Sequence, residues 1–103
     1  MLHESTSSVV VIEELNYVII RDPAFIDGYI IRGIAFRNLK KYDESIHDLS
    51  AALSINLDRP DVYFQRGLSL WMDGRNEDAL KDILQAASMK DQEAIGFLQR
   101  NLR

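Results

Sequence analysis

The 103-residue sequence contains no cysteine, and this absence excludes several kinds of chemistry. Without cysteine the chain has no disulfide framework, no thiolate metal site and no thiol nucleophile, so cysteine-based redox chemistry is excluded as well. Long apolar runs are also missing. The longest one, Val9 to Ile12, falls far below the ~20 residues that a membrane-spanning helix needs. The amino-terminal residues Met1 to Glu4 lack the basic start of a secretory signal. We therefore expect a soluble, cytoplasmic protein with no membrane insertion.

The chain has fewer basic than acidic residues. Twelve Lys and Arg residues stand against 16 Asp and Glu, which gives a net charge of −4. Nucleic-acid binding needs clustered Lys and Arg to neutralise phosphate, so this balance argues against it. A hydrophobic content of 47% with 27% charged residues is ordinary for a folded chain and too apolar for disorder. We expect one small domain over residues 1–103.

A 34-residue repeat organises the chain. The segment from Tyr29 to Gly33 aligns with the segment from Tyr63 to Gly67, with Tyr, Arg and Gly shared. The same offset pairs further residues: Phe36 with Leu70, Asp48 with Asp82, Leu49 with Ile83, and Ala52 with Ala86. It extends forward to Phe97 and Arg100 and backward to Leu15 and Val18. A fixed period of this length is typical of repeat proteins in which each unit buries its apolar face against its neighbours.

Within each period the apolar residues follow helical spacing, which predicts two helices per repeat and an all-α fold. Candidate capping residues stand near the predicted starts, namely Ser7 or Ser8, Asp43, Asn76 and Asp91. The sequence predicts six helices: Ser8 to Ile20, Asp27 to Leu39, Tyr42 to Ile55, Asp61 to Met72, Asn76 to Ser88 and Asp91 to Asn101.

Two glycines occupy equivalent positions inside predicted helices. Glycine in a helix costs ~1 kcal/mol relative to alanine, so Gly33 and Gly67 indicate that a neighbouring helix comes very close. We expect Ala52 and Ala86 to be the small residues on the other side of this contact.

These residues resemble the tetratricopeptide repeat (TPR) family, whose 34-residue unit carries a large aromatic residue followed by Gly, Ala, an apolar residue and Ala at fixed places. The better unit has Tyr63, Gly67, Leu70, Gly74, Ala79, Ile83 and Ala86 at these places, and the other has Tyr29, Gly33, Phe36, Tyr42, Ser45, Leu49 and Ala52. Arg32 and Arg66 depart from the usual Leu. The resemblance implies a solenoid of helical hairpins wound into a right-handed superhelix. We expect complete repeats at 26–59 and 60–93, flanked by a half repeat at 8–20 and a terminal helix at 94–103.

The resemblance also places ligand peptides on an inner surface lined by the first helix of each repeat. On that face the chain carries Asp27, Ile30, Ile34, Arg37, Asp61, Phe64, Leu68, Trp71 and Leu98, together with Ile95 and Leu102. Relatives that grip a carboxy-terminal carboxylate use Lys, Arg and Asn here, so a carboxylate clamp is not expected. The apolar trough with Asp27 and Asp61 at its rim suits an amphipathic helix or an extended peptide with a basic residue.

The same residues have a structural alternative. Ile30, Ile34, Phe64 and Leu68 are also candidates for plain core, touched by the second helices of the repeats. Trp71 is equally a binding anchor or a cap on the core. Burying three or four anchors would support micromolar binding once the costs of ordering are subtracted.

The two terminal helices are unusual because they expose apolar residues where terminal repeats normally present polar ones. The first carries Val9, Val10, Val11, Ile12, Leu15, Val18, Ile19 and Ile20, and the last carries Ile95, Leu98 and Leu102. We infer that another chain, or more of a longer protein, covers at least one end. Self-association into a homo-oligomer through the terminal helices is therefore the alternative function.

Catalysis has little support. His3 and His47 have no second His or Cys at metal-ligand spacing, and the run from Ser5 to Ser8 has no base beside it. An enzyme or a nucleic-acid binder would rest only on His47 and on the recurrent Arg32 and Arg66. We expect these arginines to lay their stems on an aromatic ring and to pair with a nearby Asp. The sequence thus predicts a non-catalytic protein-binding module without metal or cofactor.

Overall fold

The computed structural model describes residues 2–102, with side chains from residue 6 onward. Over these residues the chain forms six helices and no strand, which confirms the predicted all-α fold. The helices are α1 (Leu2–Arg21), α2 (Ile26–Asn38), α3 (Tyr42–Ile55), α4 (Pro60–Met72), α5 (Asn76–Ser88) and α6 (Gln92–Asn101).

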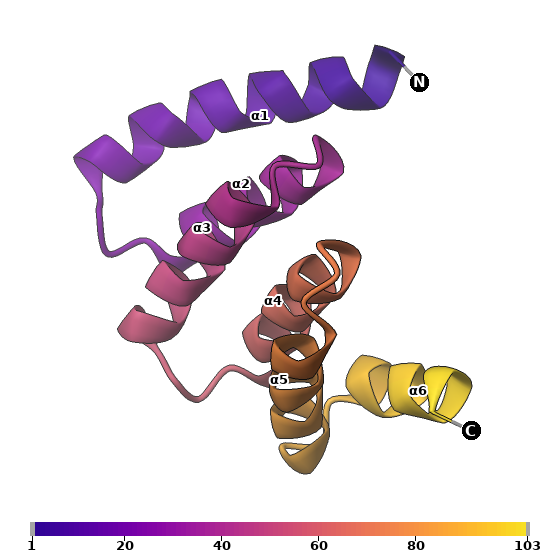
Figure 1. Cartoon of the computed structure of the whole chain (residues 1–103). Coiled ribbons are helices and arrows are strands. Elements are labelled where there is room, and N and C mark those ends of the chain that lie inside the picture. Colours follow the sequence, from indigo (N-terminus) through magenta and orange to yellow (C-terminus); the bar gives the residue numbers. More distant parts are fainter. Residues whose placement is uncertain (1, 103) are drawn as a thin grey trace.

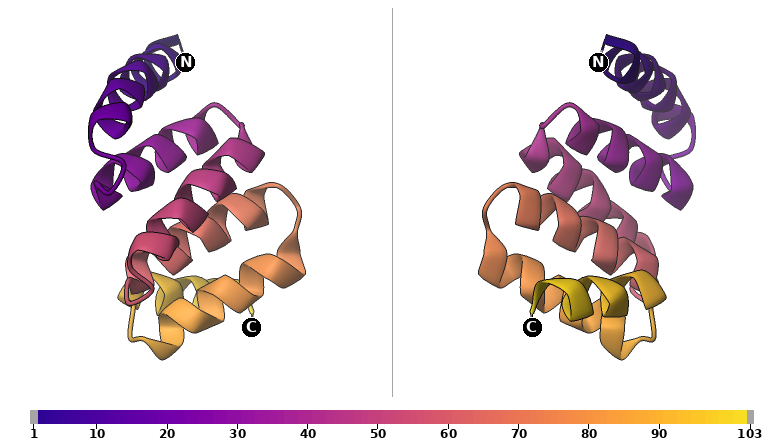
Figure 2. Two further views of the ribbon diagram at one scale, coloured as in Figure 1. Left: turned by 90° about the vertical axis from the view of Figure 1, so that its left-hand side faces the viewer. Right: turned by 90° about the vertical axis from the view of Figure 1, so that its right-hand side faces the viewer.

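The helices stack in chain order. Helices α2 and α3 form one antiparallel hairpin and α4 and α5 form the next, while α1 and α6 lie at opposite ends of the molecule (Figure 1). The side views show the same layered order (Figure 2). Each helix packs against the next one along the chain, and α2 also touches α4, so the first helices of neighbouring repeats are in contact. The architecture is a tetratricopeptide-like solenoid with extents of 41 × 32 × 20 Å.

The helix bounds agree with the sequence prediction at α3 and α5 and differ by one residue at several other ends. The main correction is α1, which runs through Ser7 and Ser8 instead of being capped by them, and Ser8 is buried on its inner side. The N-cap of α5 is Arg75 and not Asn76, without a side-chain bond. Asp91 does cap α6, because its carboxylate accepts from the backbone N–H groups of Glu93 and Ala94.

The turn inside each hairpin uses a left-handed residue at the same repeat position. Lys40 has φ 61° and Gly74 has φ 83°, and the two residues are 34 apart. The N–H that follows donates back to the helix end, from Lys41 to Phe36 O at 2.9 Å and from Arg75 to Leu70 O at 2.9 Å. This bond pattern ends a helix and reverses the chain within a few residues, and glycine adopts it without strain.

The repeat glycines lie where a second helix presses on the first, as predicted. A Cβ on Gly67 would stand 2.6 Å from Ile83 Cγ1 and 3.2 Å from the Ala79 carbonyl oxygen, and one on Gly33 would stand 3.0 Å from Leu49 Cγ. The expectation that Ala52 and Ala86 face the glycines is wrong. Two turns before these alanines in the second helix, the backbone of Ser45 or Ala79 makes the close approach, together with the large apolar side chain of Leu49 or Ile83.

The core has two parts that follow the repeats. One is centred on α3 and the start of α4, with Leu49, Ala52, Leu53 and Val62. The other joins α4, α5 and α6, with Phe64, Leu70, Ala79, Ile83, Ala86, Ala94 and Phe97. Tyr63 packs against both clusters and so connects the two repeats.

Candidate protein-binding surface

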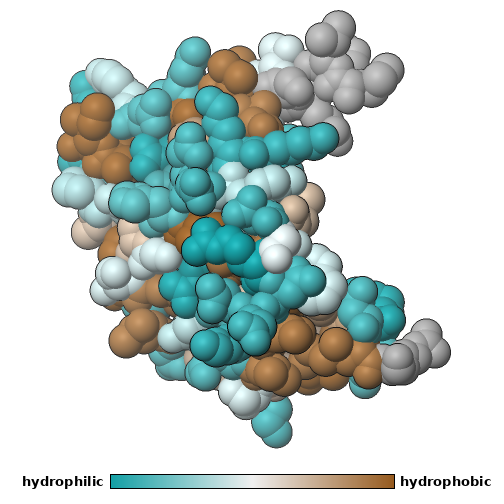
Figure 3. Space-filling model, in the orientation of Figure 1, coloured by the Kyte–Doolittle hydropathy of each residue, from teal (hydrophilic) through white to brown (hydrophobic). Residues whose placement is uncertain are grey.

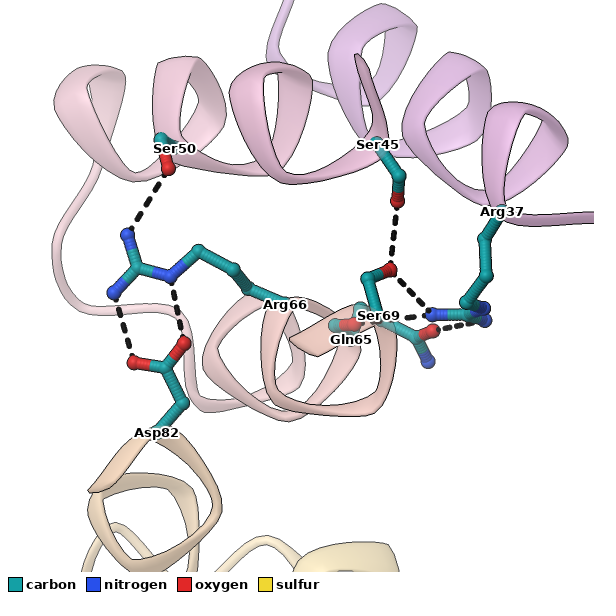
Figure 4. Close-up of polar contacts among 7 residues, drawn as sticks. All are labelled: Arg37, Ser45, Ser50, Gln65, Arg66, Ser69 and Asp82. Carbon is teal, nitrogen blue, oxygen red and sulfur yellow. Dashed lines mark hydrogen bonds and ion pairs between the residues drawn. The ribbon is translucent and has the colours of Figure 1, made fainter. Parts of the chain in front are cut away.

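An arginine in the first helix of each repeat pairs with an aspartate in the second. The Arg32 guanidinium donates to both Asp48 oxygens at 2.7 and 2.8 Å, and Arg66 donates to both Asp82 oxygens at the same distances. Each arginine also reaches the preceding repeat. Arg32 donates to Asn16 Oδ1. Arg66 donates to Ser50 Oγ (Figure 4). The hydrogen bonds that the guanidinium groups donate to these carboxylates raise the pKa of both arginines.

The predicted role of these arginines is confirmed. The Arg32 guanidinium carbon lies 5.9 Å from the Tyr29 ring centre, and that of Arg66 lies 5.9 Å from the Tyr63 ring centre. The charged heads are held by carboxylates that are themselves buried, so both pairs connect the helices of a hairpin. We call this recurrent pairing the arginine ladder.

Arg37 ties the two repeats together on the side of α2 and α4. Its Nη1 donates to the Gln65 carbonyl oxygen at 3.0 Å, and its Nη2 donates to Gln65 Oε1 at 2.7 Å (Figure 4). Ser69 Oγ lies beside the same guanidinium and shares a hydrogen bond of 2.7 Å with Ser45 Oγ. Burial lowers the pKa of Arg37, and the hydrogen bonds compensate for the lost water. Arg37, predicted as a groove residue, is thus engaged in bridging two helices.

The remaining predicted groove residues divide into core and half-buried side chains. Phe64 is only 4% exposed and belongs to the core, as the structural alternative proposed. Ile30 packs on the edge of the core cluster around Leu49, and Leu68, Trp71 and Leu98 pack on the edge of the other one. Ile34 and Ile95 are half-buried as well, whereas Leu102 is exposed. Five apolar side chains therefore keep part of their surface open on α2, α4 and α6, namely Ile30, Ile34, Leu68, Trp71 and Leu98. We call this set the inner strip.

Trp71 and Phe97 join α4 to α6. Their ring centres are 5.3 Å apart at an interplanar angle of 87°, and Phe64 meets the same Phe97 ring at 6.2 Å and 72°. Edge-to-face packing of this kind favours a fixed arrangement of the rings. Trp71 therefore packs against the core while part of the residue remains accessible.

The predicted acidic rim is partly neutralised. Arg59 donates to both Asp61 oxygens at 3.0 and 2.8 Å, and this bonding lowers the pKa of Asp61. The same hydrogen bonds raise the pKa of Arg59, and the nearby negative charge of Asp27 adds to this increase. Asp27 and Asp61 are both exposed. The sequence prediction of two acidic residues at one edge overlooked the cation between them, which comes from the loop before α4.

The α1 end of the stack exposes apolar side chains, as the sequence indicated, whereas at the α6 end Ile95 and Leu98 are half-buried and only Leu102 of the three predicted residues is exposed. On α1 the exposed apolar side chains are Val9, Val10, Tyr17 and Ile20, with exposed fractions from 45% to 81%. Leu102, just after α6, is 53% exposed. Between α1 and α6 the surface is hollowed on one side (Figure 3).

Pockets that the sequence did not indicate lie away from the inner strip. One, of about 400 Å³, is lined by Arg32, Phe36, Asp43, Glu44, His47 and Asp48. His47 is exposed there. Among the residues that the structure describes, no cluster of three His, Cys, Asp or Glu side chains could hold a metal ion. Nor is any helix within residues 2–102 long and apolar enough to cross a membrane.

Comparison with known proteins gives one curated relative. No family model matches the sequence. The TPR repeat-containing thioredoxin TDX of Arabidopsis thaliana is 30% identical to the chain over 91 residues. The match covers 88% of this chain but 24% of that protein, so the chain spans about a quarter of the relative's length.

Solved structures share the fold at low identity. The structure of MamA AMB-1 superposes with a TM-score of 0.77 at 24% identity, covering 81% of this chain and 49% of that one. The type III secretion chaperone SycD of Yersinia enterocolitica, solved in complex with a peptide of the translocator YopD, gives a TM-score of 0.81 at 16% identity. That match covers 95% of this chain and 76% of SycD.

Proposed function

Because this chain is a tetratricopeptide-like helical repeat, as its sequence predicted, we propose that it is a non-catalytic module that binds an apolar segment of another polypeptide on the inner strip. The observation that carries this proposal is the strip itself. It is a set of five half-buried apolar side chains on three first helices, and four of them, all except Ile34, pack against the core clusters. SycD, which has the same fold, is bound to a peptide in its solved complex.

The surroundings of the strip suggest the chemistry of the ligand. Asp27 and Asp61 lie at the starts of α2 and α4, and with Arg59 between them they leave one net negative charge at this edge. A basic side chain near one end of an apolar segment would meet this edge favourably. An amphipathic helix or an extended peptide fits this description, because both place apolar side chains at regular intervals.

The affinity that the strip can provide is moderate. Each fully buried apolar side chain contributes about 1.5–3 kcal/mol, and the strip offers room for three or four of them. Loss of motional freedom on association offsets much of this gain, which leaves binding in the micromolar range. Leu68 and Trp71 pack against the core, so we expect their side chains to rearrange little when a ligand binds.

A selection from a peptide library displayed on phage tests the proposal, with the 103-residue chain as bait. We expect the selected peptides to share two or three large apolar residues and a Lys or Arg. Leu68→Glu should weaken their binding at least about tenfold, because a carboxylate would have to be buried beneath the ligand.

The matched control is Leu84→Glu, which places the same charge at a leucine on α5 that is 53% exposed and outside the strip. Circular dichroism of both variants should match the wild type. Equal binding of the selected peptides to Leu68→Glu and to the wild type would refute the inner strip as the binding surface.

A further inference from the structure

The arginine ladder continues in sequence beyond the two pairs that the structure closes. Adding the 34-residue period to Arg66 leads to Arg100 in α6, and subtracting it from Asp48 leads to Glu14 in α1. Both residues are exposed, and neither makes an ion pair or a side-chain hydrogen bond among the described residues. The two terminal helices therefore carry the two halves of one further rung, an arginine on a first helix and a carboxylate on a second helix.

The face of α1 that carries Glu14 is a hairpin face without its partner helix. In α3 and α5 the equivalent residues are buried against the first helix of the same repeat, with exposed fractions between 0% and 7%: Ser45, Asp48, Leu49 and Ala52 in α3, and Ala79, Asp82, Ile83 and Ala86 in α5. In α1 these positions hold Val11, Glu14, Leu15 and Val18, which are half-buried or exposed. This face is apolar around one carboxylate, as in the complete repeats.

Helix α6 is a first helix without the second helix of its own repeat packed against it among the described residues. Its Ala94 and Phe97 are buried against α4 and α5, as expected for a first helix that follows a complete repeat. Arg100 and Asn101 lie at the positions of Arg66 and Gly67, which face the second helix of their own repeat. Both are exposed in α6 because no second helix covers them within the described residues.

We propose that α6 of one copy of the chain and α1 of a second copy pack together as the two helices of a repeat, with Arg100 bound to Glu14 of the second copy. The charges are opposite, and Leu15 and Val18 of the second copy supply apolar side chains on the face of α1 that carries Glu14. The contact uses the terminal helices and leaves the inner strip free, so it stands apart from the proposed peptide binding.

The residue sizes at this contact are consistent with a slightly wider spacing than in the complete hairpins. Asn101 replaces the close-contact glycine, and Val11 and Val18 replace the small residues found in α3 and α5. Helices with larger side chains at their contact stand further apart. Glu14 is one methylene longer than Asp48 and Asp82, which lengthens the reach of the carboxylate across the wider gap.

The placement of the two helices determines the kind of assembly. Because α1 and α6 lie at opposite ends of the stack (Figure 1), the contact joins two different surfaces and leaves one of each free on the resulting pair. Head-to-tail contacts of this sort form rings if the rotation closes and open chains if it does not. The contact is small, since α6 has ten residues, so association should be weak and dependent on concentration.

Charge reversal provides a specific test by sedimentation velocity over a range from low micromolar to millimolar protein. The average mass of the wild type should rise with concentration. Arg100→Glu alone and Glu14→Arg alone should each weaken association at least about tenfold, because two like charges then meet at the contact. The double variant should regain association.

An equimolar mixture of the two single variants is the decisive sample. In the mixture every contact between unlike chains again joins opposite charges, because it pairs either the two unsubstituted residues, Arg100 and Glu14, or the two substituted ones. The mixture should therefore associate although each variant alone does not. Symmetric contacts are excluded by the single variants, because an α1–α1 contact would be unaffected by Arg100→Glu and an α6–α6 contact would be unaffected by Glu14→Arg. The controls are Glu13→Arg, the exposed neighbour on another side of α1, and Lys41→Glu, an exposed reversal far from both ends.

A wild type that stays monomeric at millimolar concentration would overturn the proposal, and the α6 face would then serve a different polypeptide. A mixture that stays as monomeric as its components would overturn it as well. Leu68→Glu separates this assembly from the proposed function, because it should lose peptide binding and keep the rise in mass. Since all the reversed residues are exposed, circular dichroism should show unchanged helicity in every variant.

Discussion

Two glycines in helices of similar length have opposite surroundings. Gly67 lies against the fully buried Ile83 and the backbone of Ala79, neither of which can move away cheaply. The nearest atom to a Cβ on Gly96 is the flexible end of the Arg100 side chain, at 3.0 Å. One glycine is therefore required by packing, whereas the other costs helix stability without such a requirement.

We expect Gly67→Ala to lower the free energy of unfolding by about 1–3 kcal/mol, because the added methyl group overpacks the hairpin. Gly67→Leu should leave the chain largely unfolded. Gly96→Ala should instead raise the free energy of unfolding by about 0.5–1 kcal/mol through helix propensity. Urea unfolding followed by circular dichroism measures all three variants, and equal effects at positions 67 and 96 would contradict this view of the contact.

Some contacts of single residues could be predicted from the sequence, and others could not. The pairs of Arg32 and Arg66 with aspartates were predictable because each recurs after one period. The bridge from Arg37 to Gln65 was not, because Arg37 aligns with Trp71 in the next repeat and no periodic signal marks its partner. The burial of Phe64 likewise depends on Phe97, which is 33 residues away and packs on it only once α6 is in place.

At the scale of elements, the helices of the complete hairpins were predictable to within a residue, since apolar spacing and the repeat give the same answer twice. The start of α1 was not. A serine can cap a helix or lie within one, and Ser8 lies inside α1 because its position faces the neighbouring helix and is only 5% exposed. Similarly, α5 starts after Arg75 because the turn at Gly74 sets the helix start.

The Phe97 ring packs α6 against two aromatic rings of α4, which leads to a prediction at this scale. Phe97→Ala should lower the free energy of unfolding by about 3 kcal/mol, because it removes a ring packed against Phe64 and Trp71. Trp71 is the single tryptophan of the chain, so its fluorescence reports on this contact.

We expect the emission of Trp71 in Phe97→Ala to shift to longer wavelength under native conditions, before the helices melt. Leu84→Ala, at a 53% exposed leucine on the neighbouring helix, is the control and should leave the emission unchanged. If the emission of Phe97→Ala stays that of the wild type, α6 is held by contacts other than this ring.

For the whole molecule, stability should decline from the middle of the stack to its ends. Helices α3 and α4 have neighbours on both sides, whereas α1 and α6 each lie at an end. In stacked repeats each unit is stabilised mainly by its nearest neighbours, so terminal helices open with less free energy than central ones.

Hydrogen exchange read by mass spectrometry tests this expectation at low micromolar concentration, where we expect the chain to be monomeric. Amides of α3 and α4 should exchange at least about tenfold more slowly than those of α1 and α6. Raising the protein concentration should slow exchange in the terminal helices only. Equal protection along the chain would show instead that the stack opens as one cooperative unit.

The guanidinium of Arg37 has a consequence for the inner strip as a whole. Its two hydrogen bonds to Gln65 link α2 to α4 and so restrict how the two consecutive hairpins can move relative to each other. The curvature of the stack is then fixed before a ligand binds, and so is the spacing between the apolar side chains of the inner strip. If peptides bind the inner strip as proposed, we expect it to discriminate among them by the interval between their apolar side chains more than by the number of those side chains.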